Sequence, residues 1–168
     1  MSDPVSDPAS DPASDPVKDP DYVAAQTGTV IHTAISTERL EDHLAAAKDA
    51  TATDAMGAVV TFEGTVRDHD NGEGVTQLIY THHPTADAVL ARIAEETVAE
   101  YPEIRLWAEH RSGELGIGDL AFLVVVASSH RGPAFEAVAL FASRVKSEVP
   151  IWKEQEHTDG STDWVGLS

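Results

Sequence analysis

The chain has 168 residues and a mass of 17.9 kDa, a length that favours a single domain. Its 29 Asp and Glu against 11 Lys and Arg give a formal net charge of −18, which argues against a general nucleic-acid binder and against docking on anionic membranes. The absence of Cys excludes disulfides, zinc–thiolate sites and Cys nucleophiles, and no apolar run approaches the ~20 residues of a membrane span, so a cytoplasmic protein is expected.

The first 27 residues are a repetitive acidic segment. Residues 2–17 read SDPV, SDPA, SDPA and SDPV, and KDPD follows. Proline at every fourth position excludes a helix and removes backbone donors, and the segment has little apolar surface to bury. It also lacks the basic start and apolar stretch of a secretory signal. We therefore expect residues 1–27 to be a disordered tail and residues 28–168 to form the folded domain.

The charge of the folded part is also acidic, and the whole chain has only four Lys: Lys18, Lys48, Lys146 and Lys153. Many carboxylates with few Lys resemble proteins from a high-salt cytoplasm, where charge keeps a chain in solution. An ordinary acidic cytoplasmic protein has the same composition, so both interpretations stay open.

Strand and helix patterns alternate after the tail. The predicted elements are a strand over 29–35, a helix over 37–50, a strand over 57–66 and a strand over 75–82. β-Branched residues predict the strands, and Leu40, Leu44 and Ala47 have helical spacing. The polar segment 67–74 joins the last two strands, which are predicted to pair as a hairpin with a long charged tip.

The second half continues the alternation. It is predicted to contain a helix from Pro84 to about residue 101, a strand over 104–110, a glycine-rich turn over 112–119, a strand over 120–127, a helix opened by Pro133, and a closing hairpin of 151–157 with 162–165. The run LAFLVVVA is almost wholly apolar, so it predicts a central strand buried on both faces. The last helix is expected to end before Pro150 with an inward face made by Phe135, Val138, Ala139, Phe141 and Ala142. The pattern indicates an α+β fold with a sheet on one side and helices on the other.

Two of the four Lys lie in the segment VKSEVPIWKEQE. Lys146 is at a predicted helix end, Lys153 is on the next strand, and Pro150 turns the chain between them, so their side chains could converge. Two close ammonium groups repel, which lowers the pKa of at least one and makes an amine available as a base or nucleophile. Trp152 could shield that amine from water. The alternative is a pair of solvated surface Lys.

The loop 128–133 reads SSHRGP before a predicted helix. His130 and Arg131 there would lie beside free backbone N–H groups, which suits a phosphate or carboxylate. The alternative is a capped, solvated turn. If Arg67, His130, Arg131, Lys146 and Lys153 meet, they form a positive island that would attract an anionic ligand in an acidic protein.

Metal signals are weak in this sequence. Asp68, His69 and Asp70 are adjacent in sequence, and successive side chains on a strand cannot all point one way. His82 and His83 before Pro84 are better explained by a strand end and a helix cap. No metal site is expected.

Four segments together resemble the MoaE family, the large catalytic subunits of molybdopterin synthase. They are GAVVTFEGTVRDH at 57–69, EHRSGELGIGD at 109–119, SSHRGPAFEA at 128–137 and VKSEVPIWKEQE at 145–156. The resemblance covers nearly all of residues 28–168 and none of the acidic tail. It implies an α+β fold of the α/β-hammerhead type, in which a mixed, largely antiparallel sheet packs against helices and a C-terminal β-hairpin closes the domain.

The resemblance also implies an activity and a partner. Family members dimerise within a heterotetramer, and each takes up the C-terminal Gly-Gly tail of a small ubiquitin-fold subunit that carries a thiocarboxylate. Sulfur moves from that tail to cyclic pyranopterin monophosphate and forms the dithiolene of molybdopterin. No permanently bound cofactor is implied, and a sulfur donor on the partner explains how a chain without Cys could transfer sulfur.

Site residues follow from the family motifs. Lys146 and Lys153 match the two active-site Lys, with Lys153 expected as the acid or base and Lys146 as its electrostatic partner. The substrate-binding positions are Thr65, Val66, Arg67, His130, Arg131, Glu154 and Gln155. Many relatives have a basic residue and then Glu where this chain has Glu154 and Gln155, and here Asp163 precedes Trp164 where relatives often carry a basic residue. Two rival functions remain: a scaffold that binds a ubiquitin-like tail without transferring sulfur, and a sensor of a phosphorylated metabolite.

Overall fold

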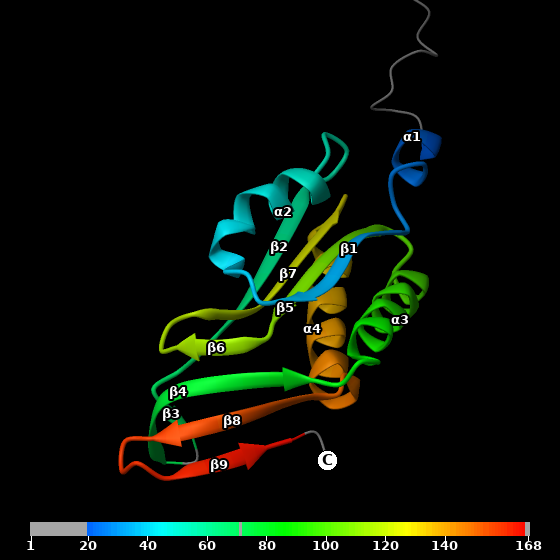
Figure 1. The fold of residues 1–168 in the computed structure, drawn as a ribbon. Helices are drawn as coiled ribbons and strands as arrows, with labels where there is room; N and C mark the ends of the chain where they lie inside the picture. Colours follow the sequence, from blue (N-terminus) through cyan, green and yellow to red (C-terminus); the bar gives the residue numbers. More distant parts are fainter. Residues whose placement is uncertain (1–19, 71, 167–168) are drawn as a thin grey trace, which may run out of the picture.

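The computed structural model describes residues 20–70 and 72–166, and Figure 1 shows two sheets with helices beside them. The helices are α1 (Pro20–Ala24), the 3-10 turn η3 (Leu40–Asp42), α2 (Leu44–Thr51), α3 (Ala86–Glu100) and α4 (Arg131–Glu148). The strands are β1 (Thr29–Ser36), β2 (Ala58–Thr65), β3 (His69–Asp70), β4 (Glu73–His82), β5 (Ile104–Arg111), β6 (Gly113–Gly116), β7 (Leu120–Ser128), β8 (Ile151–His157) and β9 (Thr162–Val165). The α+β class expected from the sequence is confirmed.

The first sheet has the strand order β1-β5-β7-β2 and is mixed. β1 runs parallel to β5, whereas β7 is antiparallel to both of its neighbours. Every residue of β7 is buried, so the predicted central strand is confirmed. Its side chains alternate between two cores, with Phe122 and Val124 on one face and Leu123 and Val125 on the other.

Helices cover both faces of this sheet, which corrects the expected arrangement with helices on one side only. α3 and α4 pack on one face around Leu90, Ile93 and Phe141, while η3 and α2 cover the other face through Leu40 and Ala47. The reason lies in β7, because a strand that is apolar on both faces needs a cover on both. Each fully buried large aliphatic or aromatic side chain contributes about 1.5–3 kcal/mol, so both layers contribute to the stability of the sheet.

The second sheet has the strand order β3-β4-β8-β9, and β6 also pairs with β4. The predicted hairpin between the strands near 57–66 and 75–82 is therefore wrong: β2 pairs with β7, and β4 pairs with β8 and β6. Backbone bonds of Val66 explain the separation, because its N–H donates to Asp119 at 2.9 Å and its carbonyl accepts from Gly118 at 2.7 Å. These bonds turn the chain out of the first sheet before β3 begins.

Several element boundaries differ from the sequence predictions. The helix expected over 37–50 is interrupted at His43, which separates η3 from α2. α4 begins at Arg131, two residues before Pro133, because proline is tolerated in a first helical turn. The side chains of Phe135 and Ala139 are exposed on α4, contrary to the expected inward face.

Two segments that were not predicted to contain regular structure include short elements. Residues 1–19 lie outside the described residues, and the end of the predicted tail contains the short helix α1, which the repeat pattern did not predict. The segment 112–119 contains β6 as well as turns. Within residues 20–70 and 72–166, the helices are too short or too polar to cross a bilayer.

Candidate functional site

A cavity of about 460 Å³ opens between the inner face of the second sheet, the C-terminal half of α4 and the ends of β2 and β7. Its polar and aromatic lining residues are Phe62, Thr65, Arg67, Asp70, Tyr80, His110, Phe122, Lys146 and Lys153. Its apolar wall is made by Ala121, Ala142, Val145, Val149, Ile151 and Val165. The cavity therefore combines an apolar wall with a small set of charged groups, which is typical of small-molecule sites.

Both Lys of the segment VKSEVPIWKEQE line this cavity. Lys146 lies in the last turn of α4, which ends at Glu148, and the chain then passes through Pro150 into β8. Lys153 faces inward because it is opposite Tyr80 on β4 and Val165 on β9, which also line the cavity. Both Lys thus line one cavity, as the turn at Pro150 allowed; the side chain of Lys153 is only 27% exposed, whereas Lys146 is exposed.

Arg67 and Thr65 reach the cavity from the end of β2, and Asp70 reaches it from β3. The Asp70 carboxylate accepts from Gln155 at 2.6 Å and from Arg67 at 3.1 Å, and it lies 3.5 Å from the ammonium of Lys153. The hydrogen bond from Gln155, with the charges of Lys153 and Arg67, lowers the pKa of Asp70. Asp70 is therefore an ionised counter-ion in a cavity that also contains three cations.

A buried histidine that no sequence motif singled out forms part of the cavity wall. His110 at the end of β5 stacks on Phe122 at a centroid distance of 5.4 Å and meets the edge of Tyr80 at 5.1 Å. Burial lowers the pKa of His110 to about 4, so its ring is neutral near pH 7. Its Nδ1 lies 2.8 Å from the carbonyl of Arg111, which fixes Nδ1 as the donor and leaves Nε2 as an acceptor.

Two further predicted residues line a smaller recess of about 70 Å³ beside the cavity. Val66 and Gln155 belong to this recess, which shares Arg67, Asp70 and Lys153 with the cavity. Glu154 is on the opposite face of β8, where it is paired with Trp164 of β9, and it lines neither space.

His130 and Arg131 lie at the start of α4 and are exposed, outside the lining of either space. The His130 N–H is 3.5 Å from the Ser128 hydroxyl, and its side chain makes no capping hydrogen bond. Within this one chain the five basic side chains therefore do not form one island: Arg67, Lys146 and Lys153 meet, and the other two lie elsewhere. Their role in holding an anion stays a prediction.

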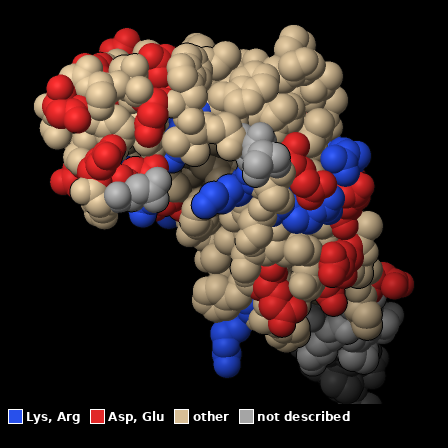
Figure 2. All heavy atoms as spheres, turned by 90° about the horizontal axis from the view of Figure 1, so that it is seen from below, with Lys and Arg blue, Asp and Glu red and all other residues tan. Residues whose placement is uncertain are grey.

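The charge around the cavity opposes the charge of the chain. Of the described residues that line it, Arg67, Lys146 and Lys153 are cationic and Asp70 is anionic, in a protein of formal charge −18. Figure 2 shows basic side chains beside a hollow on the lower face, with acidic side chains to either side. Such a local excess of positive charge favours an anionic ligand.

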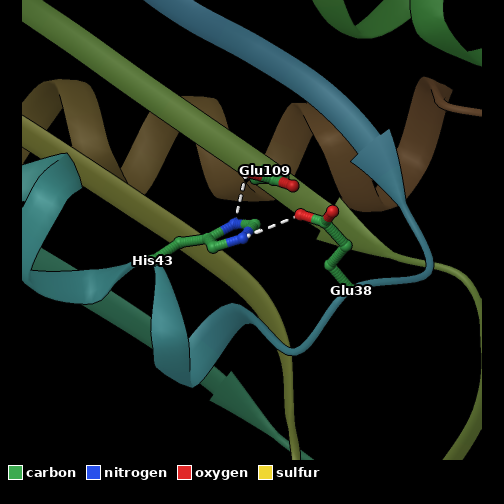
Figure 3. A group of neighbouring side chains, drawn as sticks. All are labelled: Glu38, His43 and Glu109. Carbon is green, nitrogen blue, oxygen red and sulfur yellow. Dashed lines mark hydrogen bonds and ion pairs between the residues drawn. The ribbon is translucent and has the colours of Figure 1, made fainter.

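In the part of the chain that the structure describes, two groups of side chains have the composition of metal ligands, and neither includes the residues that the sequence suggested as weak metal candidates. They are Glu38–His43–Glu109 and Glu73–His157–Asp163. In the first, His43 Nδ1 lies 3.0 Å from Glu109 and Nε2 lies 2.9 Å from Glu38, so both ring nitrogens already have carboxylate partners (Figure 3). This arrangement suits a protonated imidazole between two carboxylates rather than a metal ligand.

The helix cap expected at His83 is not formed, because the residue before the first turn of α3 is Thr85 and no side chain makes a capping hydrogen bond there; His83 lies two residues earlier, in the turn. Its Nδ1 accepts the backbone N–H of Thr85 at 3.1 Å and lies 2.8 Å from the Thr85 hydroxyl. The histidine thus closes the turn between β4 and α3.

Comparison with known proteins shows which family the chain is similar to. The family described as MoaE protein matches residues 32–148. The chain is 40% identical over 111 residues to the molybdopterin synthase catalytic subunit of Halalkalibacterium halodurans, across 66% of this chain and 70% of that protein. It is also 40% identical over 113 residues to the molybdopterin synthase catalytic subunit of Escherichia coli, across 67% of this chain and 75% of that protein.

Solved structures agree with this assignment. The structure of molybdopterin synthase from Staphylococcus aureus is similar with a TM-score of 0.68 and 33% identity, and the match covers 84% of this chain and 97% of that one. A complex of subunits 1 and 2 of molybdopterin-converting factor from Helicobacter pylori shares the fold, with a TM-score of 0.62 at 22% identity over 82% of this chain and 90% of that one. With a family match over more than half of its length and close relatives of one description, the chain belongs to the MoaE family of molybdopterin synthase catalytic subunits.

Proposed function

We propose that the cavity binds cyclic pyranopterin monophosphate and that the chain transfers sulfur to it from the thiocarboxylate of a small ubiquitin-fold subunit. The observation that carries this proposal is the convergence of Arg67, Lys146 and Lys153 on one cavity with an apolar wall. A volume of about 460 Å³ is within the range of small-molecule sites. The apolar wall suits the fused rings of a pterin, and the three cations suit its phosphate.

The phosphate would be held by charge-assisted hydrogen bonds. Arg67 can present two parallel N–H groups to phosphate oxygens, and the Thr65 hydroxyl lies at the same end of the cavity. In this proposal Val66 and Gln155 shape the adjoining recess. His130 and Arg131 are kept as anion-binding candidates because they lie at a helix N-terminus.

Sulfur addition to the pterin side chain needs proton transfers and opening of the cyclic phosphate. In this proposal Lys153 is the general acid or base, because it is half-buried and oriented by Asp70. Lys146 stabilises the negative charge that develops on the thiocarboxylate adduct or on the leaving phosphate oxygen. Both Lys line one cavity, which supports such a division of roles.

The sulfur comes from the partner rather than from this chain, which has no Cys. The partner would be a small ubiquitin-fold subunit whose Gly-Gly tail enters the cavity, within a heterotetramer built on a dimer of this chain. The Helicobacter pylori relative, named as a complex of two subunits, supports such a partnership. No permanently bound cofactor takes part in this scheme; molybdopterin is the product.

Reconstitution tests the proposal directly. Thiocarboxylated small subunit and cyclic pyranopterin monophosphate are mixed with the wild type, with Lys153→Ala and with Lys48→Ala, and dithiolene product is measured in low and high salt. Lys48 is an exposed residue of α2 outside the cavity lining, so it is a matched control for loss of one ammonium. We expect product from the wild type and Lys48→Ala and essentially none from Lys153→Ala. Equal rates for all three proteins would contradict the role of Lys153.

The same experiment separates the two rival functions. A stable complex with the small subunit that forms no product in any salt would indicate a scaffold. Binding of the pterin precursor without turnover, even with thiocarboxylated partner present, would indicate a sensor.

A further inference from the structure

The carboxylate of Asp70 lies between two of the three cations of the cavity. Its Oδ1 accepts from Arg67 Nη2 at 3.1 Å, and its Oδ2 lies 3.5 Å from Lys153 Nζ. Oδ2 also accepts from Gln155 Nε2 at 2.6 Å. The side chain is only 14% exposed, and it lines both the cavity and the smaller recess. No other carboxylate among the described residues lines either space.

The backbone explains why these groups meet. Asp70 lies on β3, which is held against β4 by the pairs His69 with Gly74 and Asp70 with Glu73. Lys153 and Gln155 are two residues apart on β8, which is the next strand across β4, so both project to the same side of the sheet. Three elements therefore position one carboxylate over the inner face of β8.

We propose that Asp70 is a positioning residue of the synthase site: it orients Lys153 and Arg67 in the free protein and competes with the anionic substrate for them. This inference rests on the proposed function, because it assigns Lys153 and Arg67 to substrate. An anion that enters the cavity meets cations whose charge is partly neutralised by Asp70. The carboxylate thus weakens binding of the ground state while it keeps the Lys153 ammonium directed into the cavity.

Two opposite effects follow for Asp70→Asn. Loss of one negative charge a few ångströms from the bound anion is expected to tighten anion binding about fivefold. Loss of the ion pair releases Lys153 from its orientation, which is expected to lower kcat about tenfold, since small misplacements of a reacting group are costly. KM and kcat therefore both fall. A residue that served stability alone would not lower KM.

The first arm of the test measures anion binding without turnover. Inorganic phosphate is titrated into the full chain at low salt and followed by NMR chemical shifts, for the wild type, Asp70→Asn and Asp68→Asn. Asp68 is a matched control because it carries the same charge only two residues from Asp70 in the chain, is 76% exposed, and lies outside both linings. We expect about fivefold tighter phosphate binding for Asp70→Asn only. Unchanged or weaker binding by Asp70→Asn, or equal tightening by Asp68→Asn, overturns the proposal.

The second arm measures kcat and KM in the reconstituted synthase. A fall in both for Asp70→Asn, with neither changed in Asp68→Asn, supports the proposal, and a fall in kcat with KM unchanged or raised overturns it. Asp70→Glu restores the charge and is expected to bind phosphate within about twofold of the wild type. If Asp70→Asn does not fold, Asp70→Ser replaces it in both arms. If the wild type forms no product, the proposed function fails, and the phosphate titration still supports or overturns the electrostatic role of Asp70.

Discussion

Replacement of His43 with Ala tests how the buried carboxylate of Glu109 is stabilised on the face of the first sheet that η3 and α2 cover. Glu109 on β5 has a side chain that is 5% exposed. Its Oε1 accepts from the Ser36 hydroxyl at 2.7 Å, and its Oε2 lies 3.0 Å from His43 Nδ1. His32 Nε2 lies 3.4 Å from the same oxygen. His43 is therefore the nearest group that can place a positive charge beside Glu109.

The pH dependence of this pair has a definite sign. Burial lowers the pKa of His43, but the hydrogen bond and charge of Glu109, together with Glu38, outweigh burial and raise it. A raised pKa means that the folded state binds the proton more tightly than the unfolded state. The stabilisation is fully present below the unfolded value of about 6.5 and is lost as the pH rises through the folded value.

The magnitude follows from the contacts that remain. A hydrogen bond to a charged group contributes about 1.5–3 kcal/mol. Because Ser36 and His32 still contact Glu109 after the substitution, we expect His43→Ala to lose about 2 kcal/mol at pH 6 and less than about 1 kcal/mol at pH 9. Urea unfolding followed by circular dichroism at pH 6, 7, 8 and 9, with a chelator present, measures this difference.

Glu38→Gln is the matched control for this experiment. Glu38 contacts the other nitrogen of His43 but is 71% exposed, so its loss is expected to cost no more than about 1 kcal/mol. A loss in His43→Ala that is the same at every pH, or larger at pH 9 than at pH 6, would refute the assignment of a protonated His43 to the buried carboxylate.

Four further substitutions probe the framework by thermal or urea unfolding. Gly57→Ala would place a Cβ 2.7 Å from the Ser129 carbonyl and is expected to cost about 1–3 kcal/mol, whereas Gly132→Ala on α4 meets nothing within 4 Å and is expected to be neutral or slightly stabilising. Arg105→Lys cannot keep the three hydrogen bonds that the guanidinium donates to backbone carbonyls at 2.7, 2.8 and 3.2 Å, and a loss of about 1.5–3 kcal/mol is expected; full retention of stability would contradict this. Phe141→Ala empties a fully buried position and is expected to cost about 3–5 kcal/mol, and a loss under about 1 kcal/mol would show that the core collapses into the space.

The local sequence pattern was sufficient to predict those helices and strands whose residues follow one clear hydrophobic period. The apolar run of β7 predicted a strand buried on both faces, and helical spacing with Pro84 predicted α3. The turn at Pro150 allowed Lys146 and Lys153 to converge, and both line one cavity, because a helix end and a strand that are joined by only a few residues stay close. These predictions needed no knowledge of distant parts of the chain.

Strand pairing could not be read in the same way. β2 and β4 are close in sequence, and this closeness favoured a hairpin between them. Each of them instead pairs with a strand from the second half of the chain. The site residues that the sequence pattern did not single out were missed for the same reason, because their roles depend on strands that are distant in sequence. Asp70 gains its role from β8, and His110 gains its role from Tyr80 and Phe122, which lie on two other strands. Phe135 was placed inward by its apolarity alone, although the helix face it occupies meets solvent.

The number of residues in the junction between α4 and β8 determines which face of β8 Lys153 occupies. Along β8, Ile151, Lys153 and Gln155 face the cavity or its recess, while Glu154 faces away. One residue inserted after Pro150 would move every residue of β8 by one position and so to the opposite face. Trp152 would then replace Lys153 at the cavity wall, and the Lys153 ammonium would point to the outer face. A gain or loss of two residues would preserve the facing but shift Lys153 along the strand by about 7 Å, beyond reach of Asp70. Length changes at this junction should therefore be far more damaging than substitutions there.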